Sequence, residues 1–242
     1  PEVFENKDNM KAFEDEYGYP LAPLKTWKEY EDLSKFFYRP EEKKWGTWTY
    51  KAPWWDVFDY KYRILSRGLY WFDDEMHPLI DSPIAIEVLK DDLRQQKYQP
   101  EESYTGIWDT SYNYLATGQI QFIHTWTSCI KFMTLKGMPV KVAIPPGYPL
   151  KTKEGVRHVG FKAASQALAV NRHSKHPELT YLLLQYYTDP QVSEWVLADP
   201  AGFYEPFREC HFKSKSIAKE NYGPTEEWGL ANLKVMEENM DY

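Results

Sequence analysis

Apolar and polar positions follow the period of a helix in the segment after Thr26. Thr26 and Glu29 have the spacing of a capping box, in which each side chain bonds an otherwise unpaired backbone amide. Four apolar residues then lie three or four positions apart, as on the buried face of a helix: Trp27, Tyr30, Leu33 and Phe37. Pro40 ends the run, so the pattern predicts a helix over about 27–37.

Other helices are predicted from their start and stop signals. The Ser82-Pro83 step supplies an N-cap serine and a first-turn proline, and apolar residues at helical spacing follow it. A helix is also expected over 109–116, before a glycine that ends it. A helix begins near Pro177, and the Asp189-Pro190 step ends it and starts another one.

Four short runs rich in β-branched and aromatic residues predict strands at 46–50, 120–126, 140–144 and 167–170. Because these strands alternate with helices along the chain, the order of elements favours an α/β fold. The sequence has no internal repeat and no low-complexity tract. No apolar run approaches the ~18 residues that a membrane-spanning helix requires.

Charge and cysteine content narrow the possible partners. The 242 residues suffice for one large domain or two small lobes, and the formal net charge is -7. Lysines and arginines are spread along the chain beside acids, whereas phosphate binding requires a basic stripe, so we expect no nucleic-acid partner. We also expect no cofactor, because no phosphate-binding loop occurs. Cys129 and Cys210 allow one disulfide, and two free thiols are an equal alternative.

Aromatic residues form 17% of the chain, with 10 Trp and 19 Tyr. These two side chains combine a flat apolar face with a polar edge, so they serve both in protein cores and against sugar rings. Four tryptophans fall close together in the sequence, at 45, 48, 54 and 55. Such a group is harder to bury completely, which favours a binding role for part of it.

Six segments, in this order along the chain, resemble motifs of a known family. The first runs from Tyr17-Gly18 to Trp27, and the others are 72–83, 115–126, 169–178, 188–191 and 202–208. The family is that of the type-1 extracellular solute-binding proteins of sugar-type ABC importers, the maltose-binding-protein class. The sequence departs from the family motif at 159–161, with one glycine in place of two, and at 122–123, with Phe-Ile in place of Ala-Met.

The resemblance implies an α/β, two-lobe, class II periplasmic-binding-protein-like fold in which much of the amino-terminal lobe is missing. It places 1–143 mainly in the carboxy-terminal lobe and 144–200 in a segment returning to the amino-terminal lobe. Residues 201–242 then form a hinge turn and a return to the carboxy-terminal lobe. The implied function is capture of a carbohydrate or polyol in the interlobe cleft and its delivery to a membrane ABC permease. The implied location is periplasmic or extracytoplasmic, with a signal peptide outside this chain.

The resemblance also places candidate ligand-binding residues in the cleft. Trp126 ends the strand predicted at 120–126, where its ring can stack on a sugar, and a core tryptophan is an equal alternative. Trp54 and Trp55 follow Pro53, where the family carries an aromatic cleft residue. In an extended segment their side chains point opposite ways, so one of them faces the cleft, and we favour Trp54.

Further candidates are polar or lie in the backbone. Asp56 can accept hydrogen bonds from sugar hydroxyls, or it is simply solvated. Arg208, in the hinge turn, can reach a ligand hydroxyl or carboxylate with its rigid donor fork, or it forms a structural salt bridge. Gly160 and Phe161 are placed by position in the family, where backbone donors approach the solute.

Enzymatic alternatives have weaker support, and we predict a binding protein. Glycoside hydrolysis requires two carboxyl groups ~5–10 Å apart across the bond, which the adjacent residues Asp73, Asp74 and Glu75 do not provide. The pair His173 and His176 has metal-like spacing but no third ligand, so we expect no metal site. A glycan-processing enzyme and a scaffold or sensor subunit without transport remain the alternative functions.

Overall fold

The computed structural model of the chain describes residues 2–138, 140–149, 155–157, 167–202 and 204–240. The chain divides into two compact units, each described by itself below. The first unit comprises residues 1–126, 141–163 and 238–242, and the second comprises 127–140 and 164–237. The assignment of these segments to the two lobes of a longer protein stays a prediction.

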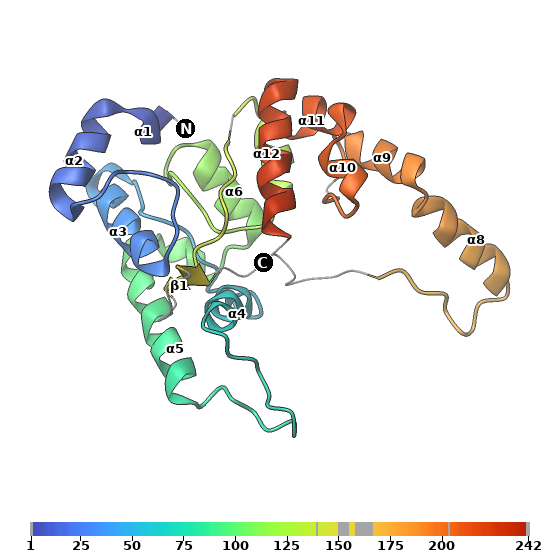
Figure 1. Ribbon diagram of the computed structural model, residues 1–242, viewed down its shortest axis with the longest axis horizontal. Coiled ribbons are helices and arrows are strands. Elements are labelled where there is room, and N and C mark those ends of the chain that lie inside the picture. Colours follow the sequence, from blue (N-terminus) through green and yellow to red (C-terminus); the bar gives the residue numbers. More distant parts are fainter. Residues whose placement is uncertain (1, 139, 150–154, 158–166, 203, 241–242) are drawn as a thin grey trace. The chain divides into compact units, whose positions relative to one another are not determined.

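The first unit consists mainly of helices (Figure 1). Its α-helices are α1 (Glu2–Glu5), α2 (Lys7–Tyr17), α3 (Trp27–Phe37), α4 (Asp56–Ser66), α5 (Pro83–Gln95) and α6 (Trp108–Ala116). Short 3-10 turns are η1 (Pro40–Glu42), η2 (Gln96–Tyr98) and η3 (Glu101–Tyr104). Strands β1 (Tyr148–Pro149) and β2 (Val156–Arg157) pair antiparallel.

The helix starts read from the sequence are confirmed. Thr26 accepts a hydrogen bond from the Glu29 amide and Glu29 accepts from the Thr26 amide, which completes the capping box of α3. Ser82 accepts from the Ala85 amide at the start of α5. These signals are local, because each cap satisfies amides within the next turn, and they therefore survive into the folded chain.

Aromatic side chains dominate the core of the first unit. Phe13 of α2 packs edge-on against Phe36 of α3, with ring centroids 5.2 Å apart. A second cluster joins α3 to α4 and contains Trp27, Tyr30 and Tyr62. A third cluster is formed by Trp48, Tyr50 and Ile120 from two extended segments. The abundance of Trp and Tyr therefore serves the core as well as the surface.

The strand predictions at 46–50, 120–126, 140–144 and 167–170 are wrong, since none of these segments forms a strand. In the first of them, two backbone amides are bonded to side chains instead of a neighbouring strand, and the Gly46 amide donates to the carbonyl oxygen of Tyr98. The Thr49 amide donates to Oε1 of Gln99, and the Tyr50 amide donates to Oδ2 of Asp59, each over 2.7 Å. Side chains nine and 50 positions away in the sequence have taken the place of a β-ladder, so an extended, buried run does not become a strand.

The second unit also consists of helices within its described residues. They are α7 (Ser128–Leu135), α8 (Pro177–Tyr187), α9 (Pro190–Ala198), α10 (Glu209–Phe212), α11 (Lys215–Asn221) and α12 (Glu226–Asn239). The predicted helices at Pro177 and Asp189-Pro190 are confirmed as α8 and α9. The buried Lys131 on α7 donates to the carbonyl oxygens of Leu197, Asp199 and Gly202, which ties α7 to the end of α9.

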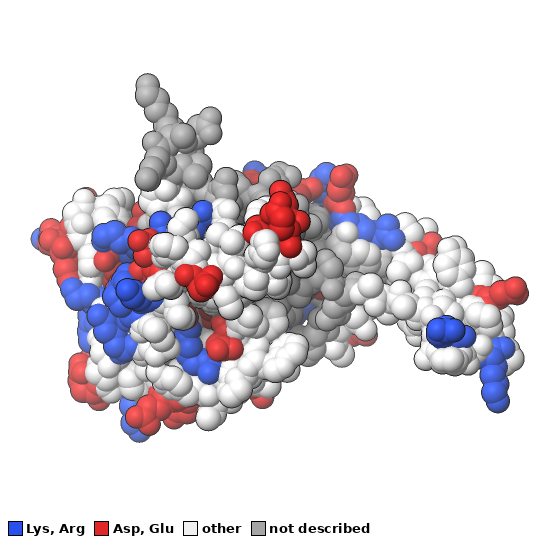
Figure 2. All heavy atoms as spheres, turned by 90° about the horizontal axis from the view of Figure 1, so that it is seen from below, with Lys and Arg blue, Asp and Glu red and all other residues white. Residues whose placement is uncertain are grey.

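The surface of α8 differs from that of the other long helices. No residue of α8 is buried, and its large apolar side chains are exposed: Leu179, Tyr181, Leu182, Leu183, Tyr186 and Tyr187. On the face drawn in Figure 2, acidic and basic side chains are interspersed over the molecule. Among the described helices, none is both long and apolar enough to cross a membrane.

The two cysteines are free thiols, so the disulfide alternative is wrong. Cys129 is buried in α7, and burial raises the pKa of its thiol, whereas Cys210 is exposed. Because the thiolate is the reactive form, we expect a disulfide reagent such as DTNB to modify one thiol per native chain and two in denaturant. Cys210→Ser should abolish the native reaction. Rapid modification of both thiols in the native chain would contradict this assignment.

Candidate functional site

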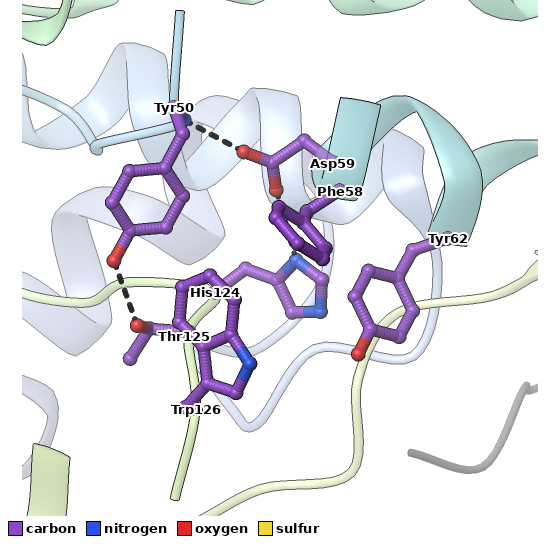
Figure 3. A pocket seen from close by; sticks show the side chains of 7 residues that line it. All are labelled: Tyr50, Phe58, Asp59, Tyr62, His124, Thr125 and Trp126. Atoms are coloured by element: carbon purple, nitrogen blue, oxygen red, sulfur yellow. Dashed lines mark hydrogen bonds and ion pairs between the residues drawn. The ribbon is translucent and has the colours of Figure 1, made fainter. Parts of the chain in front are cut away.

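A pocket in the first unit lies between α4 and the extended segment that ends at Trp126 (Figure 3). Its empty volume, including the open side, is about 210 Å³. The residues that line it come from three places in the chain: Tyr50, then Phe58, Asp59 and Tyr62 on α4, and then His124, Thr125 and Trp126. Phe58 and Asp59 each neighbour Tyr62 on the surface of α4, because residues three or four positions apart lie on the same side of a helix.

Aromatic rings surround Trp126 on one side of the pocket. Its ring centroid lies 5.2 Å from that of Phe58 and 5.5 Å from those of Tyr50 and Trp55. Trp126 is half-buried and packs against the cluster formed by Trp48, Tyr50 and Ile120. It is therefore both an edge of the core and part of the pocket wall, so the two alternatives considered for this residue are compatible.

Polar groups lie at the base of the pocket and are nearly all engaged. Both oxygens of the buried Asp59 accept hydrogen bonds, Oδ2 from the Tyr50 amide and Oδ1 from His124 Nδ1 at 3.1 Å. The Tyr50 hydroxyl is bonded to the hydroxyl of Thr125 at 2.9 Å and to that of Ser111 at 3.0 Å. Burial raises the pKa of Tyr50 well above its usual value, so this hydroxyl stays neutral and can donate.

The adjacent tryptophans take different positions. Residues 52–55 form a turn and not the extended segment that we expected. Trp54 has a φ of 81° and is 82% exposed, whereas Trp55 is the residue before α4 and contacts Tyr50 and Trp126. Asp56 is exposed at the first position of α4, where a negative charge favours the helix N-terminus. The roles of these three residues in ligand binding stay predictions.

The remaining predicted site residues lie elsewhere. Arg208 belongs to the second unit, directly before α10, and its guanidinium donates to the carbonyl oxygen of Thr188. That bond gives it a structural role in its own unit. Gly160 and Phe161 lie outside the described residues. The binding roles of all three residues stay predictions.

The sequence analysis missed most of the pocket: Tyr50, Phe58, Asp59, Tyr62, His124 and Thr125. One signal was available, since Phe58 and Asp59 each have helical spacing to Tyr62 directly after the tryptophan pair. His124 lies two residues before Trp126 in the same extended segment. No spacing rule relates it to Asp59, which is 65 positions away.

Other titratable groups of the first unit do not line the pocket. Asp73, Glu75 and His77 bring one ligand atom each within 4.8 Å of one another in an exposed turn. His77 Nδ1 is already paired with Oδ2 of Asp73 at 3.0 Å. In the second unit, the His173 amide donates to Asn171 in the exposed turn before α8. The described residues there form no cluster of three metal-ligating side chains.

Solved structures share the fold of this chain. A solute-binding protein of Agrobacterium radiobacter K84 in complex with ribitol has a TM-score of 0.69 at 14% identity, over 96% of this chain and 56% of that one. A protein of Agrobacterium vitis S4 with bound D-mannitol has a TM-score of 0.65 at 14% identity, over 95% and 55%. The maltose-bound MalE3 of T. maritima has a TM-score of 0.63 at 22% identity, over 94% and 57%.

The fold is therefore that of the class II periplasmic binding proteins, and the chain spans 55–57% of the length of these structures. The family of bacterial extracellular solute-binding proteins matches residues 3–194. The chain belongs to this family, whose members are binding proteins and not enzymes. A comparison with curated proteins finds no match.

Proposed function

We propose that the chain is part of an extracytoplasmic solute-binding protein that captures a sugar or polyol and delivers it to a membrane ABC importer. The observation that carries this proposal is the group of rings around Trp126 beside the polar base of the pocket. Sugars and polyols present C–H faces and hydroxyls to the protein, and the residues that line the pocket include both aromatic rings and polar side chains. The bound ribitol, D-mannitol and maltose of the similar structures support the same class of ligand.

The proposed mechanism is closure of two lobes around the solute. A solute that touches both lobes binds the closed form more strongly, so it shifts the population towards closure, and the importer recognises that form. In this proposal, the pocket of the first unit is one part of the solute-binding cleft. In the proposed assignment, 1–143 belong mainly to the carboxy-terminal lobe, 144–200 return to the amino-terminal lobe, and 201–242 return through the hinge.

The carboxyl groups at the pocket support binding over hydrolysis. Glycoside hydrolysis in its usual form requires two carboxyl groups ~5–10 Å apart, one on each side of the bond. Among the described residues that line the pocket, Asp59 supplies the one carboxylate, and both of its oxygens already accept hydrogen bonds. We therefore propose that solute leaves the site unchanged.

Thermal unfolding in the presence of D-mannitol, ribitol or maltose tests this function. At a concentration one hundred times Kd, a bound solute adds about 2.7 kcal/mol to the free energy of unfolding, which raises Tm by about 5–10 °C for a chain of this size. Trp126→Ala removes the central ring and should weaken the affinity by about tenfold to a hundredfold. Trp126→Phe keeps an aromatic ring and should lose less affinity than Trp126→Ala.

Trp195→Ala is the matched control, because that tryptophan is 77% exposed on α9 in the other unit. It should leave the affinity unchanged. Trp54→Ala and Trp55→Ala, measured in the same way, decide which member of the pair contacts solute. If no solute changes Tm, or if Trp126→Ala binds as well as the unsubstituted chain, the proposed site is wrong.

A further inference from the structure

One ring nitrogen of the residues that line the pocket has no hydrogen-bond partner among the described residues. His124 is 9% exposed, and its Nε2 is buried without a hydrogen bond to any described residue. Buried polar atoms in folded proteins nearly always have a partner. In a histidine that serves only the core, both ring nitrogens form hydrogen bonds. We therefore expect the hydrogen-bond partner of Nε2 to come from outside the described residues.

The bond to Asp59 decides which nitrogen of the neutral ring carries the proton. A carboxylate accepts only, so His124 Nδ1 must be the donor in its contact with Oδ1. The other oxygen of Asp59 accepts from the Tyr50 amide, which holds the carboxylate in place. In the neutral imidazole, Nε2 then has a lone pair and acts as an acceptor.

Packing holds the imidazole in one orientation. The ring stands edge-on to Trp27, with centroids 5.6 Å apart, and to Tyr62, with centroids 4.6 Å apart. Figure 3 shows it between the side chains of Asp59 and Tyr62, with Trp126 close by. His124 and Trp126 both line the pocket, so the acceptor and the aromatic wall belong to the same site.

We propose that His124 is a specificity-determining residue whose Nε2 accepts a hydrogen bond from a hydroxyl of the bound solute, with Asp59 as the positioning residue that fixes the tautomer. This inference rests on the proposed function, because it concerns the same pocket. Nε2 is buried in the solute-free chain, so the bond forms when a wall side chain moves aside for the solute. The preferred ligand is a polyhydroxy compound with a free hydroxyl at that position.

The lone pair also determines what the pocket rejects. An analogue in which that hydroxyl is replaced by hydrogen or by an O-methyl group leaves Nε2 unpaired in the complex. A carboxylate oxygen at the same place would face the lone pair without a proton between them. The pocket should therefore prefer polyols and neutral sugars to sugar acids and to the matching deoxy compound.

Two substitutions of His124 test the roles of its two ring nitrogens separately. In His124→Asn, the side-chain amide can still donate to Asp59 but has no atom at the Nε2 position. In His124→Gln, an amide group lies near the Nε2 position, and the bond to Asp59 is given up. Calorimetric titration uses whichever of D-mannitol, ribitol and maltose stabilises the unsubstituted chain most. We expect about tenfold or more loss of affinity for the Asn variant and about threefold or less for the Gln variant.

Two further readouts distinguish recognition from a structural role. The unsubstituted chain should bind one mono-deoxy analogue of that solute about tenfold or more weakly than the parent, and the Asn variant should bind the two alike. Nitrogen-15 NMR of the solute-free, unsubstituted chain should show the proton of His124 on Nδ1 and a lone pair on Nε2. This measurement requires no variant to fold.

Each outcome decides between the proposals. Equal affinity of the Asn variant and the unsubstituted chain, or a proton on Nε2 in the NMR spectrum, overturns the role of His124 and leaves the solute-binding function intact. Absence of binding by the unsubstituted chain to all three solutes overturns the proposed function and this inference together. Loss of deoxy discrimination in the Asn variant supports the inference directly.

Discussion

Asp92→Ala is expected to lower the free energy of unfolding by about 3–5 kcal/mol. The carboxylate of Asp92, on α5, lies 2.5 Å from Lys51 Nζ and 3.3 Å from Arg63 Nε. The side chains of Lys51 and Asp92 are 5% exposed, and that of Arg63 is 1% exposed. Without Asp92, two buried cations lose the carboxylate with which they are paired, and an uncompensated buried charge is costly. Urea unfolding followed by tryptophan fluorescence measures the change.

Glu87→Ala is the matched control for Asp92→Ala. Glu87 is also on α5 and is also paired with an arginine, Arg67, at 2.9 Å, but its side chain is 63% exposed. Exposed pairs contribute about 0–1 kcal/mol, so this variant should unfold almost as the unsubstituted chain does. Similar losses in the two variants would contradict the role given to the buried network.

Gly46→Ala is expected to destabilise the first unit by about 3 kcal/mol or more, because its new methyl group has no room. A Cβ at this position would lie 1.9 Å from the carbonyl oxygen of Ser34 and 2.6 Å from its carbonyl carbon. These atoms belong to the backbone of α3, so either the helix or the segment at 46–50 must shift. The same urea experiment measures the loss.

The control for Gly46→Ala is Gly118→Ala. Gly118 has a φ of 70°, and no atom lies within 4 Å of the place that its new methyl group would take, so the variant measures backbone strain without a clash. Strain of this kind costs about 1–2 kcal/mol. If Gly46→Ala is no more destabilising than Gly118→Ala, the close approach of the segment to α3 is not a constraint.

Asp92→Ala and Gly46→Ala both alter elements that position the pocket. Arg63 is on α4, the helix of Asp59, and its guanidinium lies 3.9 Å from the centre of the Trp27 ring. Lys51 directly follows Tyr50, whose amide bonds Asp59. The buried network thus holds α4 and the segment at 46–51 together, and both of them contribute side chains to the pocket wall. We expect partial losses of solute affinity to accompany losses of stability here.

Local signals in the sequence determined where α3, α5, α8 and α9 begin, whereas α4, which carries three of the pocket residues, was not predicted. The capping box of Thr26 and Glu29, the Ser82-Pro83 start and the Asp189-Pro190 step act within a single turn, and the structure confirms each of them. The order of six motifs indicated the family, which the match over residues 3–194 shows. The sequence also singled out Trp126, which the structure places in the pocket wall.

Tertiary structure decided the strands and the polar base of the pocket. Whether the segment at 46–50 forms a strand depends on where its amides find partners, and Gln99, 50 positions away, and Asp59, nine positions away, accept from two of them. The pairing of His124 with Asp59 spans 65 residues and obeys no periodicity. Helix caps can be read from sequence because donor and acceptor are neighbours in the chain, whereas these contacts exist only once the chain has folded.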